Sequence, residues 1–537
     1  MRRCDADPYN QRQLNKILIA NRGEIAVRVI RACRELGLRS VAVYSDCDRS
    51  ALHVRYADEA YAIGSNPAVD SYLRIDRLID VAKRSGADGV HPGYGFLAEN
   101  ESFAAACGDA GLTFIGPSPD VIALMGSKTA ARKIATRAGV PVVPGTVEPL
   151  PATASDAEML TRAAEVGYPL LVKAVAGGGG RGMRAVDAPA GLLAAVRTAR
   201  SEASASFGDP AVYFERRLVR PRHIEVQLLG DHDGTVLPFV ERECSIQRRH
   251  QKLIEETPSP AVSPELREAL TSAAARIAGA VGYTNAGTME FRVDGGRNEF
   301  YFLEANTRLQ VEHPITELVT GVDLVAWQIA IARGERLTLD PGRLLVPNGH
   351  AIECRVYAED PAEGFLPSPG RITSLRSPSG PAVRDDSGVV TGSEIPIFYD
   401  SLMSKVATWG PNRPTALARM ARAMAEYDVR GVRTTIPFFK WILQDPDFRD
   451  ARIDTTFVDR ALDLHGGRLP TATPVEAEAL AAMAVALHIL QGQATRASGS
   501  RSCDSAGWKA RARFEALRDW PPSSAPAPGA PLRMTRE

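Results

Sequence analysis

The chain has 537 residues, its 64 Lys and Arg balance 64 Asp and Glu, and 45% of its residues are apolar. A net charge of zero gives no long-range field that would favour nucleic acid or a membrane surface as a partner. The longest apolar stretch, residues 479–490, is shorter than the roughly 20 residues that a membrane span needs. Length and composition therefore predict a soluble protein of several domains.

Cysteine usage and the first residues predict where the protein works. The seven cysteines are odd in number, scattered, and contain no CxxC pair. This pattern argues against a disulfide framework and against a zinc site. The opening residues 1–15 contain no apolar segment of the kind found in a signal peptide. These features together predict a cytoplasmic protein.

The first domain is predicted from a closely spaced strand, helix and strand. Residues 16–20 have the pattern of a buried strand, 24–36 that of an amphipathic helix, and 40–44 that of a second strand. Such a βαβ unit implies a parallel sheet. The turn between strand and helix is not G-x-G-x-x-G, so a dinucleotide is not implied. A glycine-rich stretch at 89–100 follows another strand end, where α/β sheets place ligand loops.

Two segments are candidate phosphate sites. Residues 126–129, Gly-Ser-Lys-Thr, resemble the end of a P-loop, but the spacing fails because Val121 stands where the first glycine belongs. Lys128 remains a candidate phosphate ligand, with a solvated helix lysine as the alternative. In the second segment, 177–183, four glycines precede Arg-Gly-Met, and backbone N–H groups there can approach phosphate oxygens closely. A flexible linker is the alternative, but a linker seldom lies between two predicted strands.

The predicted strands that flank the glycine segment extend this candidate nucleotide site. Lys173 ends the strand at 168–174 and adds positive charge. The end of the predicted strand at 212–218 offers backbone N–H donors and C=O acceptors that could hydrogen-bond the edge of an adenine ring. Residues 222–228 alternate polar and apolar types, which predicts a half-buried strand with 236–240 as its partner. The run 241–252 carries four basic side chains interleaved with apolar ones, which favours a basic cavity wall over a solvated surface.

Two glutamates on neighbouring strands predict a metal site. Glu290 lies in the strand at 287–291 and Glu304 at the end of the next strand, with a glycine turn between them. A hairpin can place the two carboxylates side by side, where they repel unless a cation lies between them. With Asn306 as a third oxygen ligand, the group suits Mg²⁺. The alternative, one acid in an ion pair and one on the surface, is disfavoured by the Asn-Thr-Arg that follows Glu304.

After residue 350 the pattern changes to short strands and turns. Alternation at 351–357 and helices at 414–427 and 437–444 predict a mixed α+β domain. Past residue 466 a capped helix is predicted at 473–490, followed by a polar linker, a short helix and a disordered tail.

Five motifs carry a resemblance to biotin carboxylase, the ATP-grasp component of biotin-dependent carboxylases. They are Ile-Ala-Asn-Arg-Gly-Glu-Ile-Ala (19–26), His-Pro-Gly-Tyr-Gly-Phe-Leu (91–97), the glycine loop 177–182, Arg-Arg-His-Gln-Lys (248–252) and Glu-Ala-Asn-Thr-Arg-Leu-Gln-Val-Glu-His-Pro (304–314). Each glycine motif alone would be weak, but the order and spacing of all five agree over about residues 15–460.

The resemblance implies an α/β and α+β multidomain fold. Its expected parts are a Rossmann-like (pre-ATP-grasp) N-terminal domain at 15–125, an ATP-grasp domain at 126–345 with a mobile lid at about 142–217, and a biotin carboxylase C-terminal domain at 346–460. Residues 466–537 would form a helical and partly disordered tail of unknown role.

The resemblance also implies ATP-dependent carboxylation of biotin by bicarbonate, with residues assigned by motif. The expected ATP-binding residues are Lys128, Lys173, Gly179, Gly180, Glu215, Arg216, Arg217, Leu218, His223, Gln247, His250, Glu290 and Glu304. Mg²⁺ or Mn²⁺ would be held by Glu290, Glu304 and Asn306. Bicarbonate would be bound by Lys252, Arg308, Gln310 and Val311, and biotin by Arg355, Tyr94 and Arg28. The expected catalytic residues are Arg308, Glu312, Lys252 and Arg355, with Glu312 as the base that deprotonates bicarbonate and Arg355 as the group that stabilises the biotin enolate.

The partners follow from one missing motif. No Met-Lys-Met occurs, so biotin is expected on a separate biotin carboxyl carrier protein, and acyl transfer on carboxyltransferase subunits. The first expectation is a homodimeric subunit of acetyl-CoA carboxylase in fatty acid biosynthesis. The alternatives are propionyl-CoA, methylcrotonyl-CoA or pyruvate carboxylase. Another ATP-grasp ligase is disfavoured by the Glu-Cys-Arg context of Arg355, and an inactive scaffold by the intact acidic and basic site residues.

Overall fold

The computed structural model of the chain describes residues 14–146, 148–151, 153–175, 183–294, 299–467, 469, 480 and 482–489. The chain divides into two compact units, residues 1–469 and 470–537, and residues 482–489 of the second unit are helical. The predicted glycine loop at 177–182, the capping segment 473–476 and the chain after 490 lie outside the described residues.

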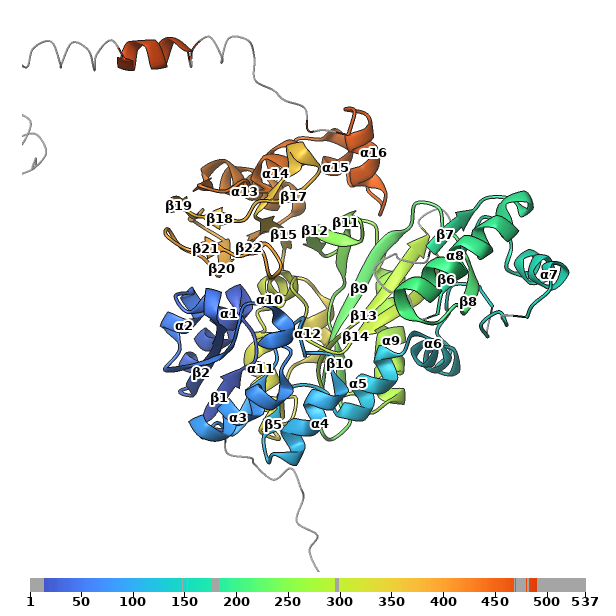
Figure 1. Ribbon diagram of the computed structural model, residues 1–537, viewed down its shortest axis with the longest axis horizontal. Helices are drawn as coiled ribbons and strands as arrows, with labels where there is room; N and C mark the ends of the chain where they lie inside the picture. Colours follow the sequence, from blue (N-terminus) through green and yellow to red (C-terminus); the bar gives the residue numbers. More distant parts are fainter. Residues whose placement is uncertain are drawn as a thin grey trace, which may run out of the picture. The chain divides into compact units, whose positions relative to one another are not determined.

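The N-terminal domain is built on a five-stranded parallel sheet in the order β3-β2-β1-β4-β5, which confirms the predicted βαβ unit (Figure 1). Alternate side chains of β1 face opposite ways: Ile17 and Ile19 pack with α1, and Leu18 packs with the cluster that includes α3 and α4. The elements are β1 (Lys16–Ile19), α1 (Gly23–Glu35), β2 (Arg39–Ser45), α2 (Leu52–Tyr56), β3 (Glu59–Gly64), α3 (Ile75–Ser85), β4 (Gly89–His91), α4 (Glu101–Asp109) and β5 (Thr113–Phe114).

This strand order places a ligand crevice between β1 and β4. The chain leaves β1 toward β2 on one side and enters β4 on the other, and such a reversal opens a crevice at the carboxyl ends of the strands. The two segments that follow these strands, residues 21–25 and 94–96, line the cavity described below.

A small subdomain with a core of its own occupies the predicted lid region. Its antiparallel sheet has the order β7-β6-β8, and α7 and α8 pack on it around Leu170, Val172 and Phe214 (Figure 1). A lid that moves as one body needs a hydrophobic core of its own, and this subdomain has one. The elements of this region are α7 (Asp156–Val166), β6 (Leu170–Ala174), β7 (Met183–Val186), α8 (Leu192–Phe207) and β8 (Val212–Arg216). Helices α5 (Pro119–Gly126) and α6 (Lys128–Arg137) precede it and contribute to a different core.

The centre of the molecule is a nine-stranded sheet in the order β14-β13-β9-β11-β12-β15-β22-β20, with β10 paired to β9. The predicted hairpin is confirmed, because Glu290 on β13 pairs in register with Glu304 on β14. The elements of its first part are β9 (Arg222–Gly230), β10 (Val236–Pro238), β11 (Arg242–Arg248), β12 (Gln251–Thr257), α9 (Pro264–Ala280), β13 (Asn285–Asp294), β14 (Glu299–Asn306), α10 (His313–Thr320), α11 (Leu324–Ala332) and α12 (Pro341–Leu345).

The prediction that residues 222–228 form a half-buried strand was wrong in its burial. Every residue of β9 after Arg222 is buried, because the strand lies between β13 and β11. Two of its polar side chains are satisfied inside the protein: Glu225 and Gln227 both bind the buried guanidinium of Arg242.

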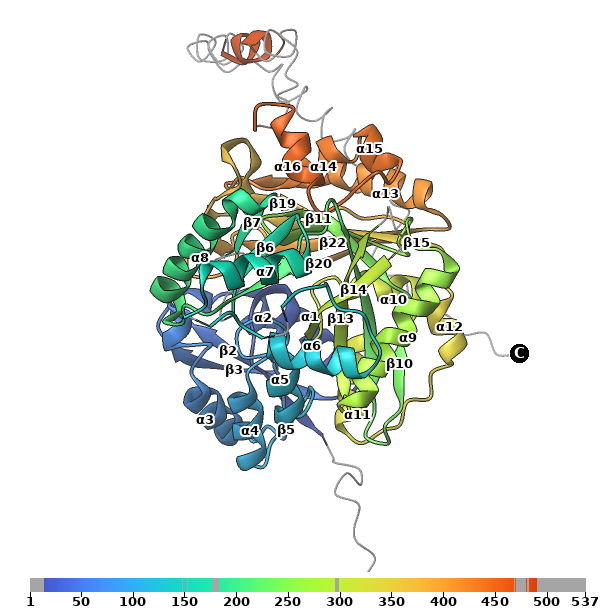
Figure 2. The same cartoon turned by 90° about the vertical axis from the view of Figure 1, so that its right-hand side faces the viewer.

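The C-terminal domain continues the central sheet, because β15 pairs antiparallel with β12 (Figures 1 and 2). Side chains on β15 and β22 therefore reach the same cavity wall as those on β12. The elements are β15 (His350–Tyr357), β16 (Glu359–Asp360), β17 (Leu366–Pro367), β18 (Gly370–Arg371), β19 (Ser374–Arg376), β20 (Val383–Ser387), β21 (Glu394–Ile395), β22 (Leu402–Gly410), α13 (Arg413–Glu426), β23 (Asp428–Arg430), α14 (Ile436–Ile442), α15 (Pro446–Arg449) and α16 (Phe457–Asp463).

In the part of the chain that the structure describes, no single helix has the length and apolarity to cross a membrane. Helices α10 and α11 pass that test only as a pair bent by 96°.

Candidate active site

One cavity of about 1270 Å³ gathers side chains from all three domains. Its lining brings together most of the residues that the sequence predicted for ATP, metal and substrate. These are Tyr94, Lys128, Lys173, Glu215, His223, Gln247, His250, Lys252, Glu290, Glu304, Asn306, Arg308, Gln310, Val311 and Arg355.

Five predicted residues lie outside the lining: Arg28, Arg216, Arg217, Leu218 and Glu312, the last of which is bound by the lining residues Lys252 and Arg355. The side chain of Arg216 donates to the Val166 carbonyl, and Arg217 forms an exposed ion pair with Asp187. Strand side chains alternate, so Glu215 faces the cavity and Arg216 faces away. Leu218 follows the end of β8 and does not reach the lining.

Another of the five, Arg28, is buried one helical turn beyond the cavity. Its guanidinium lies 3.0 Å from Glu317 and 2.7 Å from Asp323. The structure does not bring Arg28 to the expected biotin site. The remaining two predicted residues, Gly179 and Gly180, lie outside the described residues.

The paired acids have the properties of a cation site. Burial and the charge of Glu290 raise the pKa of Glu304. Burial would also raise the pKa of Glu290, but Lys252 and His223 hold it well below the usual range. Asn306 Nδ2 donates to Glu290 Oε1 at 3.0 Å, and its amide oxygen, beside the two carboxylates, accepts from Arg308. Buried carboxylates that oppose each other's charge, with an amide oxygen beside them, fit a hard divalent cation.

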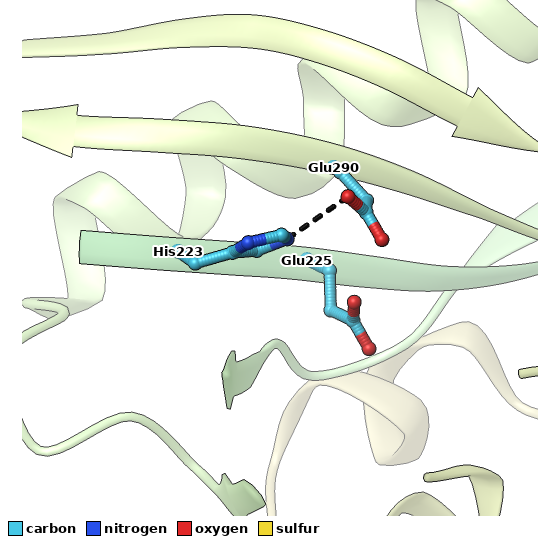
Figure 3. A group of neighbouring side chains, drawn as sticks. All are labelled: His223, Glu225 and Glu290. Carbon is cyan, nitrogen blue, oxygen red and sulfur yellow. Dashed lines mark ion pairs between the residues drawn. The ribbon is translucent and has the colours of Figure 1, made fainter. Parts of the chain in front are cut away.

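Glu290 also belongs to a second group with metal-ligand chemistry, together with His223 and Glu225 (Figure 3). His223 Nε2 lies 3.0 Å from Glu290 Oε2. The Glu225 oxygens already contact cations, Arg242 Nε at 2.5 Å and Lys252 Nζ at 2.5 Å. The charge of Glu225 is therefore compensated, which favours Glu304 over Glu225 as the partner of Glu290 around a metal.

Changing Glu304 to Gln is expected to raise the Mg²⁺ concentration that half-maximal ATP turnover needs by about tenfold or more, because one anionic ligand is lost. A Mg²⁺ titration of ATP turnover measures this. The matched control is Glu299→Gln, an exposed position on the same strand. An unchanged Mg²⁺ requirement in Glu304→Gln would remove Glu304 from the metal site.

Lys252 connects Glu290 of the candidate metal site to Glu312. Its Nζ lies 2.5 Å from Glu225, 2.8 Å from Glu290 and 2.7 Å from Glu312. Burial alone would lower the pKa of this amine, but the three carboxylates raise it well above its usual value. Lys252 is therefore a fixed positive charge.

Glu312 is fully buried directly before α10 and is held by two cations. Lys252 Nζ and Arg355 Nη2 lie 2.7 and 2.8 Å from its two oxygens. Burial would raise its pKa, but Lys252, Arg355 and Arg242 hold it well below the usual range. The carboxylate is thus ionised and oriented, as a proton acceptor must be.

The guanidinium of Arg308 is held in place by its neighbours. It donates to Gln310 Oε1 at 3.1 Å and to Asn306 Oδ1 at 3.0 Å, and its Nε lies 2.8 Å from Glu99. A planar guanidinium fixed in this way beside the cavity suits a planar oxyanion.

Three residues of this network, Glu225, Arg242 and Glu255, were not predicted from the sequence. Glu225 and Arg242 bind each other inside the sheet, and Glu255 Oε1 lies 2.6 Å from Arg355 Nε. Burial raises the pKa of Glu255 to about 7 despite the charge of Arg355. The available signal was the alternation at 222–228, which puts His223, Glu225 and Gln227 on one face of the predicted strand.

Comparisons with known proteins match all three parts of the fold. Residues 13–122 match the biotin carboxylase N-terminal domain, 127–340 the ATP-binding domain of the carbamoyl-phosphate synthase L chain, and 353–460 the biotin carboxylase C-terminal domain.

Individual relatives agree with these matches. A pyruvate carboxylase subunit of Methanothermobacter thermautotrophicus is 54% identical over 446 residues, which cover 83% of this chain and 89% of that protein. Biotin carboxylase of Nostoc sp. is 51% identical over 446 residues, 83% of this chain and 99% of that one. The biotin carboxylase domain dimer of Hydrogenobacter thermophilus 2-oxoglutarate carboxylase, solved with MgADP, ADP and bicarbonate, has a TM-score of 0.79 and 48% identity, covering 84% of this chain and 98% of that one. The chain belongs to the biotin carboxylase family, whose members are ATP-dependent ligases with an ATP-grasp domain.

Proposed function

We propose that this chain carboxylates biotin on a separate carrier protein, using ATP and bicarbonate, by way of carboxyphosphate. The observation that carries the proposal is the Glu312 carboxylate, held between Lys252 and Arg355 at 2.7 and 2.8 Å beneath a cavity that also contains the acid pair. One cluster thus supplies a proton acceptor, cationic groups for an oxyanion and a cation site.

In the first step, Glu312 takes the proton of bicarbonate. Bicarbonate is a weak nucleophile until this proton leaves, and Lys252 and Arg308 offset the charge that develops on its oxygens. The freed oxygen bonds to the γ-phosphorus of ATP while the bond to the β–γ bridging oxygen breaks, which gives carboxyphosphate and ADP. The cations around Glu312 hold its pKa below the usual range, so the carboxylate is ionised at neutral pH.

The opposite part of the cavity is assigned to the nucleotide phosphates. Glu290, Glu304 and Asn306 would hold the divalent cation, which neutralises phosphate charge when bound. Lys128 and Lys173 line the same cavity and add positive charge. We assign the subdomain at about 142–217 as the lid whose closure excludes the water that would hydrolyse carboxyphosphate.

Biotin is assigned to the part of the cavity next to Arg355 and Tyr94. Arg355 is bound by Glu255 and Glu312, so its guanidinium is fixed where the negative charge of deprotonated biotin would lie. Carboxyphosphate transfers its carboxyl carbon to the biotin nitrogen: a C–N bond forms, the bond from that carbon to the phosphate oxygen breaks, and the departing phosphate takes the proton of the nitrogen. Arg28, which the structure places outside the cavity, has no part in this assignment.

We propose that the chain acts in the cytoplasm as part of a homodimer, with a biotin carboxyl carrier protein and carboxyltransferase subunits as partners. The dimer of the Hydrogenobacter thermophilus domain supports the oligomeric part. Acetyl-CoA carboxylase is the first candidate assembly. Pyruvate carboxylase is the second, because the Methanothermobacter relative is named as part of a pyruvate carboxylase. Purifying the native complex and identifying its carboxyltransferase component decides between the two.

The purified chain is expected to turn over ATP only when bicarbonate is present, and free biotin is expected to stimulate that turnover. Bicarbonate is required because the nucleophile is the carbonate formed from it at Glu312. Biotin stimulates turnover because it consumes the carboxyphosphate that results. ADP release, measured with and without each compound, tests this. Turnover that is indifferent to both would overturn the proposed function.

A further inference from the structure

Lys405 is a fully buried lysine to which the reaction described above assigns no role. It lies on β22, and its side chain is 0% exposed. Burying an ammonium group is costly unless acceptors surround it, so its contacts indicate its purpose.

The contacts of Lys405 join three domains. Its Nζ donates to the backbone carbonyl of Val311 at 2.7 Å and lies 3.4 Å from Glu24 Oε1. The same nitrogen lies 5.6 Å from the centre of the Tyr94 ring, and the Tyr94 hydroxyl donates to Glu24. One lysine of the C-terminal domain thus connects the segment before Glu312 to two cavity-lining residues of the N-terminal domain.

The bond to Val311 acts directly on the backbone of Glu312. The Val311 carbonyl belongs to the planar peptide group that joins Val311 to Glu312, so holding this oxygen fixes the start of the Glu312 side chain. Residues 307–312 form neither strand nor helix, so no regular hydrogen-bond ladder fixes them. Lys252 and Arg355 orient the carboxylate, and Lys405 holds the backbone that carries it.

Nearby acids do not account for the lysine. Asp386, its register partner on β20, already receives two bonds from Arg384, at 3.0 and 2.7 Å. Burial raises the pKa of Glu353 well above its usual value even with Lys405 nearby, which favours the neutral form of that carboxyl. Glu24 remains as the nearest carboxyl: burial raises its pKa to about 7, Lys405 opposes that rise, and the side chain lines the cavity.

We propose that Lys405 is a positioning residue for the carboxylation reaction. It holds the Val311–Glu312 peptide in place and, through Glu24 and Tyr94, ties the bicarbonate base to the biotin side of the cavity. The inference rests on the proposed role of Glu312.

The test compares Lys405→Met with the double variant Lys405→Met/Glu24→Gln in the full chain. Methionine keeps the length of the side chain but removes its donor, and glutamine removes the buried charge that this change leaves without a partner. Relative to Glu24→Gln alone, the double variant is expected to lose kcat on the order of 10²-fold, because small displacements of a reacting group cost about that much. Its affinity for ADP is expected to be unchanged and its Tm higher than that of Lys405→Met. Lys440→Met, an exposed position in the same domain, is the matched control.

A structural role alone would give a different result. The inference is overturned if the double variant has the kcat of Glu24→Gln, or if kcat and ADP affinity fall together. A double variant that does not fold also overturns it, since the lysine would then serve the fold. Wild-type protein without bicarbonate-dependent turnover would overturn the proposed function instead, before any variant is compared.

Discussion

Replacing Glu312 by Gln is expected to lower kcat for bicarbonate-dependent ATP turnover on the order of 10³-fold while nucleotide affinity stays unchanged. Glutamine fills the same space but cannot accept the proton of bicarbonate. The cations around it stay paired, because Lys252 keeps Glu225 and Glu290, and Arg355 keeps Glu255. Steady-state ADP release and calorimetric ADP binding measure the two quantities.

The matched control for Glu312→Gln is Glu241→Gln. Glu241 is likewise a fully buried glutamate, paired with Arg267 at 2.6 Å, and neither of the two lines the cavity, whereas Lys252 and Arg355, which hold Glu312, do. That variant is expected to lose stability and keep its kcat. If Glu312→Gln lost nucleotide binding, Glu312 would be a ligand of the metal and not the base.

Replacing Lys252 by Met is expected to abolish turnover and to lower the free energy of unfolding by about 3–5 kcal/mol. The amine is the shared counterion of three buried carboxylates, and those of Glu290 and Glu312 are held ionised partly by its charge. The loss is expected to be largest near neutral pH and to shrink as pH falls, because the carboxylates then take up protons and no longer need the lysine. Denaturant unfolding of wild type and variant at several pH values measures it.

Lys83→Met, on the exposed side of α3, is the control for the stability effect and is expected to leave the free energy of unfolding unchanged. A Lys252→Met protein as stable as wild type at neutral pH would show that the three carboxylates are compensated by other groups.

The positions of the site residues along the chain could be predicted where local pattern decides them. The glycine turn after residue 294 implied a hairpin, and the hairpin set Glu290 opposite Glu304. The resemblance carried by the motifs also implied that Lys252, Arg308 and Arg355 share one site, and all three line the cavity.

What could not be predicted depends on packing between distant strands. Whether Glu225 faces water or a buried arginine depends on which strand lies beside β9. Neither the residue types nor the spacing of apolar residues along the sequence predicts that neighbour. Lys405 reaches Val311 only because β22 joins the central sheet 94 positions later in the chain. Arg28 follows the motif at 19–26, yet helix α1 turns its side chain toward Glu317 and away from the cavity.

The central claim is that bicarbonate, deprotonated at Glu312, attacks the γ-phosphorus of ATP. Turnover with ¹⁸O-labelled bicarbonate tests it, because the oxygen that bonds to phosphorus stays on the phosphate when carboxyphosphate breaks down. The account predicts one ¹⁸O atom in each phosphate released, and almost no turnover in Glu312→Gln. Phosphate that carries oxygen from water alone would contradict it.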